Sequence, residues 1–578
     1  MKKRRAGCSL RTLPLPPLAL ALASVSPVWA QQSADSAAST PIATVDSIIV
    51  TGTRGVRTVA DSLAPVDVIG EKELASTGQT DLRRALEEIL PSFATAQGSS
   101  GGTGKAVKSG SLRGLGGNYV LVLVNGKRRH LSALTGGGAA TGQSPADLNL
   151  IPTSAVARVE VLRDGAAAQY GSDAIAGVIN VILKSASEGG NAAVGYGQYG
   201  KGPGGVGEQG KTKNVQLNQG LKLGEDGGFV NLSFEGSDQG NTNFSGPYKD
   251  SYLLYPKVNG AYDSREFGTS RYRQIWGQPS VENYVASYNA ELPIGGGTKL
   301  YSFGTAARRI SAVNGGYRAP TNPLVITEIF PDGYLSKLQV KEVDYQVVAG
   351  AKGNNIAGWD WDVSTSYARD NAQLNVLDAL NASLGPTAPT RYYNGRQIFS
   401  EWTTNLDLTR SVPHDWAQEP LFVSLGAEFR RSTYAQRAGE WASYGDGGWV
   451  HPDGSNAGEK LNPGVAFQAG FTPDEAGSWS RHDTALYLDL SQKVNEDWDV
   501  GAAARLENYS DVGLVRSGKV SARYQVAPRW ALRSTYSNGF RAPSLQQSYN
   551  QNSQAQWATN AYTGEQYHDL APDLRTPI

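Results

Sequence analysis

Alternation of apolar and polar residues dominates the chain from about residue 190 onward. Apolar residues there recur at every second position, in runs of roughly ten residues, the length with which a tilted strand crosses the hydrocarbon layer of a membrane. Examples are the runs Val230–Phe234, Trp359–Tyr367, Leu421–Phe429, Leu486–Leu490 and Trp498–Leu506. Strands in lipid must satisfy their backbone polar groups by pairing with one another, as a closed barrel does. The pattern predicts a transmembrane antiparallel β-barrel over residues 188–578.

The connections between these runs alternate in length. Gly224–Gly228 is a tight turn, whereas Ser237–Ser280 and Tyr434–Ser480 are long loops. Short turns at one end and long loops at the other are typical of outer-membrane barrels. A soluble β-sandwich also has alternating strands, but it does not explain so many long strands joined in this way.

Residues 55–187 follow a different pattern, which predicts a small soluble α/β domain of about 130 residues. Thr80-Asp81 is expected to cap an amphipathic helix over Leu82–Leu90. Tyr119–Val124 is an apolar strand followed by the hairpin signal Asn125-Gly126. Two further strands are expected at Val156–Leu162 and Ile175–Leu183.

The first 30 residues predict a cleaved signal peptide. A basic stretch, Lys2–Arg5, precedes the apolar stretch Leu13–Val25, and Val28-Trp29-Ala30 provides a cleavage site. An uncleaved anchor is the alternative. Cys8 is the one cysteine of the chain, so the mature protein is expected to contain no disulfide and no reactive thiol.

Composition narrows the class of function. The 53 Lys and Arg residues balance the 53 Asp and Glu residues, which gives no support to a nucleic-acid partner. The mean hydropathy of −0.36 argues against a helical membrane protein but not against a barrel, in which alternate residues face lipid.

Three chemical patterns occur without the context that their chemistry requires. Gly205–Thr212 fits a nucleotide-binding loop, but no buried strand precedes it and no helix follows. Gly98–Gly102 fits a nucleophile elbow, but it lies in a Gly/Ser-rich loop. The five histidines lack the spacing of metal ligands. We expect no catalytic residue, no bound metal and no cofactor.

Several ordered segments resemble TonB-dependent outer-membrane receptors. Ser47–Arg54 is similar to the TonB box that opens their mature chains, and the long block Val156–Lys184 is similar to the core of their plug domain. Shorter similarities occur at Ser111–Leu115, Val122–Gly126 and Asn538–Ser544. The block departs from the commonest family pattern at Asp164-Gly165, where Gly-Pro is usual, which points to a subfamily.

The resemblance implies energised import through a barrel that an N-terminal α/β plug domain occludes. The inner-membrane protein TonB would pair with the box residues Ser47, Ile48, Ile49, Val50, Thr51 and Gly52 as an added strand. The family default ligand is a ferric siderophore, with haem, a cobalamin or an oligosaccharide left open. A monomer in outer-membrane lipid is expected. A passive porin and a surface-binding barrel are the rival functions.

Two groups of residues are candidates for specific roles. Arg158, Glu160 and Arg163 are expected to form charge pairs between plug and barrel wall, or else to be solvated charges on a strand. The aromatic residues Trp441, Tyr444 and Trp449 lie in a Gly-rich segment and are expected to contact a planar or sugar-like ligand. Packing of this segment against neighbouring loops is the alternative.

The sequence divides into a signal peptide (1–30), a spacer with the TonB-box-like segment (31–54), the plug (55–187) and a partial barrel (188–578). About fourteen strand candidates compare with about 22 strands in transporters of this class. The last residues, Ala571–Ile578, contain prolines and do not predict a strand. A longer chain that completes the barrel is therefore expected.

Overall fold

The computed structural model describes residues 62–95, 102–107, 110–136, 142–200, 209–452, 457–458 and 460–552. It also describes the backbone of the short strands β1 (Ile48–Ile49), β2 (Arg57–Thr58), β23 (Ala555–Thr559) and β24 (Gln566–Leu570). The predicted signal peptide, most of the spacer, the first half of the nucleotide-loop-like segment (205–208) and Ala571–Ile578 lie outside the described residues. The described residues all belong to one unit within residues 43–578.

A five-stranded mixed sheet with the order β3-β8-β9-β6-β7 organises the N-terminal part of the described chain. Its strands are β3 (Val66–Gly70), β6 (Val120–Val124), β7 (Lys127–Arg128), β8 (Val156–Leu162) and β9 (Gly177–Leu183). Helices α1 (Glu71–Ser76), α2 (Leu82–Ile89) and α3 (Ala167–Tyr170), and the pair β4 (Phe93–Thr95) and β5 (Gly110–Leu112), complete this part, which we call the plug.

Local sequence explains these elements. Asp81 caps α2 as expected, and its side chain accepts a hydrogen bond of 2.7 Å from the Arg84 backbone N–H. All five residues of β6 are buried, because the strand lies inside the sheet between β9 and β7. The predicted α/β domain is thus observed, with a core that includes Leu86, Val122 and Val159.

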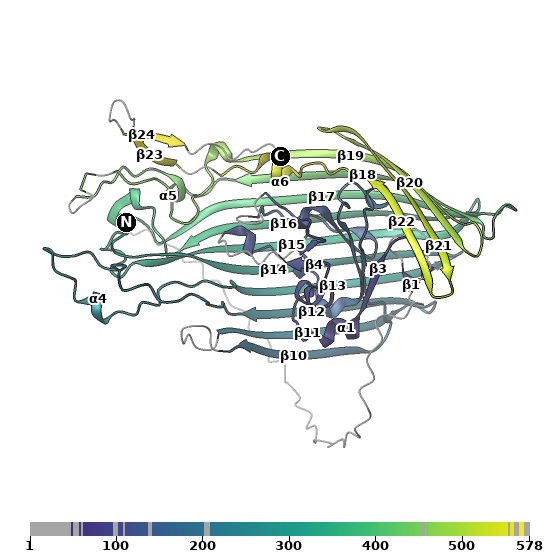
Figure 1. Cartoon of the computed structure of the whole chain (residues 1–578), viewed down its shortest axis with the longest axis horizontal. Helices are drawn as coiled ribbons and strands as arrows, with labels where there is room; N and C mark the ends of the chain where they lie inside the picture. The colour runs from purple at the N-terminus through teal and green to yellow at the C-terminus, as the bar shows by residue number, and fades with distance from the viewer. Residues whose placement is uncertain are drawn as a thin grey trace, which may run out of the picture. The chain divides into compact units, whose positions relative to one another are not determined.

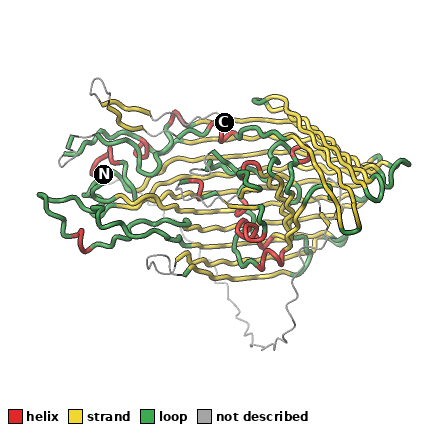
Figure 2. Tube along the Cα trace, viewed as in Figure 1, coloured by secondary structure: helices red, strands yellow, loops and turns green. Residues whose placement is uncertain are grey.

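Most of the remaining described chain forms one antiparallel sheet of 13 strands in sequence order, β10 to β22 (Figures 1 and 2), and β1-β2 and β23-β24 form separate pairs. The strands are β10 (Gly190–Tyr199), β11 (Gln209–Leu223), β12 (Gly228–Gln239), β13 (Ser280–Gly295), β14 (Thr298–Arg318), β15 (Tyr334–Ile356), β16 (Trp359–Leu377), β17 (Arg391–Val412), β18 (Leu421–Arg437), β19 (Gly477–Lys493), β20 (Trp498–Tyr509), β21 (Gly513–Ala527) and β22 (Trp530–Asn538).

Most connections in this sheet alternate as the sequence predicts; the connection after β20, residues 510–512, lies at the end of the long loops but is also short. Tight turns follow β11, β13, β15, β19 and β21, whereas connections of many residues follow β12, β14 and β18. The longest connections carry the short helices α4 (Arg265–Gly268) and α5 (Trp441–Tyr444), and the helix α6 (Leu545–Tyr549) follows β22. We refer to the two ends of the strands as the short-turn end and the long-loop end.

The large sheet curves around the plug. Strands far apart in the sheet contact the same small domain through one face: Glu235 of β12 accepts from Thr153, and Tyr509 of β20 contacts Ser172. Residues of the opposite face are mostly exposed apolar side chains, such as Leu232, Val347 and Leu488. Among the helices that the structure describes, none is long and apolar enough to cross a bilayer.

Candidate functional site at the boundary between plug and sheet

The predicted TonB-box segment is described only at Ile48–Ile49. This dipeptide forms β1 and pairs antiparallel with β2 (Arg57–Thr58). The other box residues, Ser47, Val50, Thr51 and Gly52, lie outside the described residues. An extended backbone is the form in which a strand can be added to a partner. Recognition of this segment by TonB stays a prediction.

The predicted plug charges form ion pairs within the plug. Arg158 Nη2 lies 2.8 Å from Glu160 Oε1, because residues two apart on a strand share a face. Arg163 Nε lies 2.8 Å from Asp67 Oδ2 on the neighbouring strand β3. The ion pairs that cross from plug to sheet, described next, are formed by other residues.

A run of four basic residues after the plug hairpin, Lys127–His130, makes much of the contact with the sheet. Lys127 Nζ lies 3.2 Å from Asp362 Oδ1 on β16 and 3.1 Å from Asp407 Oδ2 on β17. Tyr301 donates a hydrogen bond of 2.6 Å to the same Asp362 oxygen. Burial by itself would lower the pKa of Lys127, but Asp407 and Asp362 outweigh it and raise this pKa. Lys127 therefore stays charged at the boundary.

The next residues of the run are more deeply buried. The guanidinium of Arg129 forms an ion pair with Asp344 of β15 and donates 2.8 Å to Thr305 Oγ1 of β14. His130 Nε2 lies 2.9 Å from the second oxygen of Asp344. The Arg129 and Asp344 side chains are each 1% exposed. A charge so buried depends on its partner, since removal of either partner leaves the other desolvated.

Arginines also approach the plug from the sheet. Arg309 of β14 lies 2.7 Å from the plug carboxylate Asp147. A second plug carboxylate, Asp173, pairs with Arg128 within the plug and lies 3.5 Å from Arg430 of β18. Burial by itself would raise the pKa of Asp173, but Arg128 and Arg430 outweigh it and hold this pKa well below its usual range.

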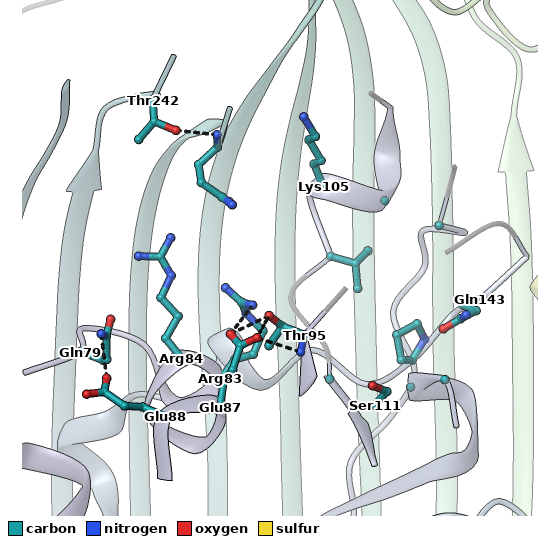
Figure 3. A pocket seen from close by; sticks show the side chains of 18 of the residues that line it. Gln79, Arg83, Arg84, Glu87, Glu88, Thr95, Lys105, Ser111, Gln143 and Thr242 are labelled. Carbon is teal, nitrogen blue, oxygen red and sulfur yellow. Dashed lines mark hydrogen bonds and ion pairs between the residues drawn. The ribbon is translucent and has the colours of Figure 1, made fainter. Parts of the chain in front are cut away.

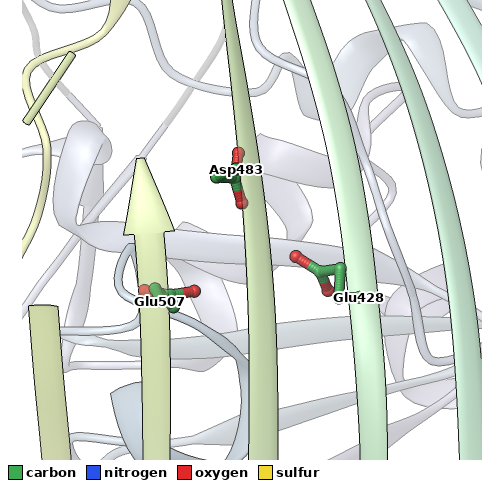
Figure 4. Close-up of side chains that lie close together, drawn as sticks. All are labelled: Glu428, Asp483 and Glu507. Carbon is green, nitrogen blue, oxygen red and sulfur yellow. The ribbon is translucent and has the colours of Figure 1, made fainter. Parts of the chain in front are cut away.

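Three buried carboxylates on neighbouring strands, Glu428, Asp483 and Glu507, lie close enough together to suggest a metal site (Figure 4). Arginines already neutralise them. Arg505 lies 3.2 Å from Glu428 and 2.7 Å from Glu507, and Arg430 lies 3.0 Å from Asp483. A cation here would meet two guanidinium groups, so the cluster fits a structural ion-pair network better than a metal centre.

Sequence reasoning did not single out these boundary residues. Two signals were available: the basic run Lys127–His130 directly after a hairpin, and carboxylates such as Asp344 and Asp370 within alternating strands. The two signals belong together because the basic residues of the plug and the carboxylates of the sheet are buried against each other. Only the folded chain shows which charge meets which.

A cavity of about 640 Å³ lies toward the long-loop end, between the plug and the sheet (Figure 3). Helix α2 and the plug loops line it on one side, and Tyr199, Thr242, Phe244 and Gln278 of the sheet and its loops line it on the other. Arg84 Nη1 donates 3.2 Å to the Tyr199 hydroxyl. The volume of this cavity fits a ligand of a few tens of atoms.

Lys105 lines this cavity and contacts its loop wall. Its Nζ donates 3.1 Å to the Gly277 carbonyl and lies 5.0 Å from the centre of the Trp276 ring. Burial lowers the pKa of Lys105. An anionic group in the cavity would stabilise the charged form of this side chain.

A second cavity, of about 460 Å³, lies at the opposite, short-turn end. Lys127, Asp362 and Asp407 line it together with Gly297 and Asn354, which lie beside the tight turns. The ion-paired boundary therefore has a cavity at each end, and the Lys127 pair lies in the wall of the second.

The predicted aromatic residues Trp441, Tyr444 and Trp449 lie in the long connection after β18. Trp441 is 57% exposed, whereas the Trp449 ring packs edge-to-face on His451, with ring centres 4.9 Å apart. None of the three lines either cavity among the described residues. Their contact with a ligand stays a prediction.

Comparison with known families agrees with this architecture. A model described as TonB-dependent Receptor Plug Domain matches residues 58–178. A model described as TonB dependent receptor-like, beta-barrel matches residues 301–575. The chain belongs to the TonB-dependent receptor family. Its large sheet corresponds to the barrel wall of that family, and we use this name below.

Individual relatives are distant. The vitamin B12 transporter BtuB of Vibrio vulnificus (strain CMCP6) is 24% identical over 509 residues, which are 87% of this chain and 64% of that protein. The ferric enterobactin receptor PfeA of Pseudomonas aeruginosa has a TM-score of 0.60 at 17% identity, covering 85% of this chain and 64% of that one. The siderophore receptor PirA of Acinetobacter baumannii has a TM-score of 0.59 at 16% identity, covering 88% and 66%. The chain thus spans about two thirds of the length of these relatives.

Proposed function

We propose that this protein is an outer-membrane transporter that imports a ferric siderophore with energy supplied through TonB. The observation that carries the proposal is the plug itself: a folded domain held inside the barrel wall by ion pairs, with a cavity at each end of the boundary. A passive porin needs an open channel and has no use for such a domain.

The arrangement suggests how import would proceed. Ligand would enter the cavity at the long-loop end, where Arg84 and Lys105 offer cationic groups to an anionic iron complex. TonB would pair with the extended segment around Ile48–Ile49 and pull on the plug. Pulling would separate pairs such as Lys127 with Asp362, which lie beside the second cavity. Water from the second cavity can hydrate both charges as they separate, whereas separation of an apolar interface would expose hydrophobic surface.

A second ligand class follows from one comparison. The vitamin B12 transporter BtuB is a relative that matches 87% of this chain, so a cobalamin is the alternative ligand. The solved structures named above are siderophore receptors, but at 16–17% identity they support the fold rather than the ligand. The experiment below distinguishes a ferric siderophore from a cobalamin.

The test measures uptake by cells that lack their own receptors and express this full chain. Iron-55 enterobactin and cobalt-57 vitamin B12 are supplied separately, with and without a protonophore. We expect iron uptake that the protonophore abolishes. Deletion of residues 47–52 should abolish uptake while surface binding of the labelled ligand persists. Deletion of the six spacer residues 36–41 is the matched control and should leave uptake unchanged.

Other results would contradict the proposal. Uptake of vitamin B12 but not of iron would show that the ligand is a cobalamin, while energised import through TonB would still hold. Iron uptake that survives both the protonophore and the box deletion would indicate a passive channel instead. Surface binding without uptake in the unaltered chain would indicate a surface-binding barrel.

A further inference from the structure

The family-like motif Asn538–Ser544 ends strand β22 at the long-loop end and leads into α6. The chain turns inward here, because α6 packs against β18 and β19. Leu545 is 3% exposed and belongs to an apolar cluster with Phe399 and Tyr434 of the barrel wall. We call residues 539–551, which include most of the motif and all of α6, the strap.

Short-range hydrogen bonds give the strap a fixed shape. Ser544 caps α6: its hydroxyl accepts 3.2 Å from the Gln547 backbone N–H, and the Gln547 side chain accepts 2.9 Å from the Ser544 N–H. The same Gln547 oxygen also accepts 2.8 Å from Arg541 Nη1. Two residues of the motif, Arg541 and Ser544, therefore hold the start of α6 in place.

One side of the strap contacts the plug through α6. Gln546 is fully buried, and its Nε2 donates a hydrogen bond of 2.8 Å to the backbone carbonyl of Ser132. Ser132 is itself buried and lies two residues after the basic run Lys127–His130. Loss of the Gln546 amide would leave a buried carbonyl without this donor, which costs more than the loss of an exposed bond.

Arg541 forms a second contact between strap and plug. Its Nε lies 3.9 Å from Asp173 Oδ1, and its guanidinium carbon lies 5.9 Å from the centre of the Tyr119 ring. The Arg541 side chain is buried, so water screens this pair weakly. The strap thus bonds to two plug segments that are far apart in the sequence.

Three wall strands hold the strap from its other side. In each case a wall side chain donates a hydrogen bond to the strap. The bonds run from Arg481 Nη1 of β19 to the Pro543 carbonyl (2.7 Å), from Gln397 Nε2 of β17 to Asn550 Oδ1 (2.6 Å) and from Gln436 Nε2 of β18 to the Gln551 carbonyl (2.7 Å). In addition, the Tyr549 ring stacks on Trp479, with ring centres 5.1 Å apart.

The position of the strap decides which of its contacts a moving plug would break. Gln397, Gln436 and Arg481 lie near the long-loop ends of their strands, whereas Lys127 of the plug lines the cavity at the short-turn end. The strap therefore contacts the plug on the side away from that cavity. A plug that moves toward the short-turn end would break its bonds to Gln546 and Arg541 and leave the wall contacts of the strap intact.

We propose that the strap retains the plug: it stays with the barrel wall and restrains the plug in its resting position until TonB pulls. The bonds to Ser132 and Asp173 are buried, so water does not replace them before the plug moves. Gln546 and Arg541 act as positioning residues for the plug. This inference rests on the proposed function for the direction in which the plug moves.

The first test measures hydrogen exchange by mass spectrometry on the purified full-length protein in detergent micelles, without ligand and without TonB. Exchange rates report how often each segment opens. The backbone N–H groups of Ser548 and Asn550 donate within α6. We expect peptides of the strap to exchange as slowly as those of β18 and β19, and more slowly than plug peptides around Ser132.

The second test weakens the two plug contacts separately. Gln546→Met removes the bond to Ser132 and keeps the length of the side chain, and Arg541→Gln removes the charge beside Asp173. Each variant should speed exchange of the plug peptides by about five-fold or more. In cells that lack TonB, both variants should admit more labelled vancomycin, a large antibiotic, than the unaltered protein does.

The matched control is Ser548→Met, because Ser548 lies in the same helix but is exposed. This variant should leave both plug exchange and antibiotic entry unchanged. Arg541→Lys, which keeps the charge, should resemble the unaltered protein, and gel mobility with and without heating shows whether each variant is folded.

Two results would overturn the proposal. Exchange of the strap together with the plug in the unaltered protein would show that the strap moves with the plug. Plug exchange and antibiotic entry that neither Gln546→Met nor Arg541→Gln changes would show that the strap does not restrain it. Iron uptake is measured separately: its absence in the unaltered protein would count against the proposed function alone, because hydrogen exchange requires neither ligand nor TonB.

Discussion

At the scale of single residues, buried charge distinguishes this boundary from an ordinary domain core. Arg129, Asp344 and Arg309 are each almost fully buried, yet each has a partner of opposite charge within 3 Å. Replacing such a pair by apolar residues often leaves stability unchanged or higher. Stability alone therefore does not explain these charges. The proposed function accounts for them, because a plug that leaves the barrel during import would expose this surface to water.

The residue-scale prediction concerns Asp173. Its pKa lies below the usual value, so its stabilising effect is full above the unfolded-state pKa of about 3.9 and is lost as the pH falls further. We expect Asp173→Asn to lower the melting temperature of the plug at pH 7. The difference from the unaltered protein should shrink below about pH 4. Calorimetry between pH 3 and pH 8 measures this, and a difference that is constant with pH would contradict it.

At the scale of elements, strands and turns followed the sequence closely. Strand β8 has the predicted bounds Val156–Leu162, and α2 ends one residue before the predicted Leu90. The barrel strands are longer than predicted: β18 continues to Arg437, into the segment expected to be a loop from Tyr434 onward. Above the membrane the outer face of a strand can be polar, so alternation no longer marks its end.

The element-scale prediction concerns the turn that presents the basic run. Asn125 and Gly126 have φ values of 47° and 79°, as the hairpin signal implies. We expect Gly126→Ala to lower the free energy of unfolding of the plug by about 1 kcal/mol, because a Cβ disfavours this backbone conformation. An added Cβ meets no atom there, so the cost is one of conformation alone.

Gly246→Ala is the control for this turn. Gly246, in a loop, also has free space around an added Cβ, but its φ is not positive. Chemical denaturation of both variants makes the comparison. Equal stability of the Gly126→Ala variant and the control variant would show that the positive φ of Gly126 is not the cause of the destabilisation.

At the scale of the whole molecule, one sheet separates two environments. Its inner face holds the plug through charges, and its outer face presents residues such as Leu486, Leu488 and Val500. The same alternation that predicted a barrel thus also assigns each side chain to lumen or lipid. Membership of the TonB-dependent receptor family agrees with this assignment.

The whole-molecule prediction tests that outer face. Leu488 of β19 is 42% exposed and lies beside Leu425 and Ala504 on the neighbouring strands. We expect Leu488→Arg to destabilise the protein in phosphocholine bilayers by about 2–4 kcal/mol, because the charge would lie in hydrocarbon. Glu496→Arg, in the exposed turn after β19, should change stability by less than about 0.5 kcal/mol. Similar effects of the two variants on folding into bilayers would contradict a lipid-facing position for Leu488.

The sequence by itself determined the class of fold and the position of most elements, because period-two alternation, the Asp81 cap and the Asn125-Gly126 turn act over a few residues. It also carried the resemblance that identified the family. Only the tertiary structure decided which charges meet. Arg158 and Arg163 pair within the plug, whereas Lys127 and Arg129 reach carboxylates more than 200 residues away. Pairing of distant charges depends on how the sheet curves around the plug, and no local pattern encodes that curvature.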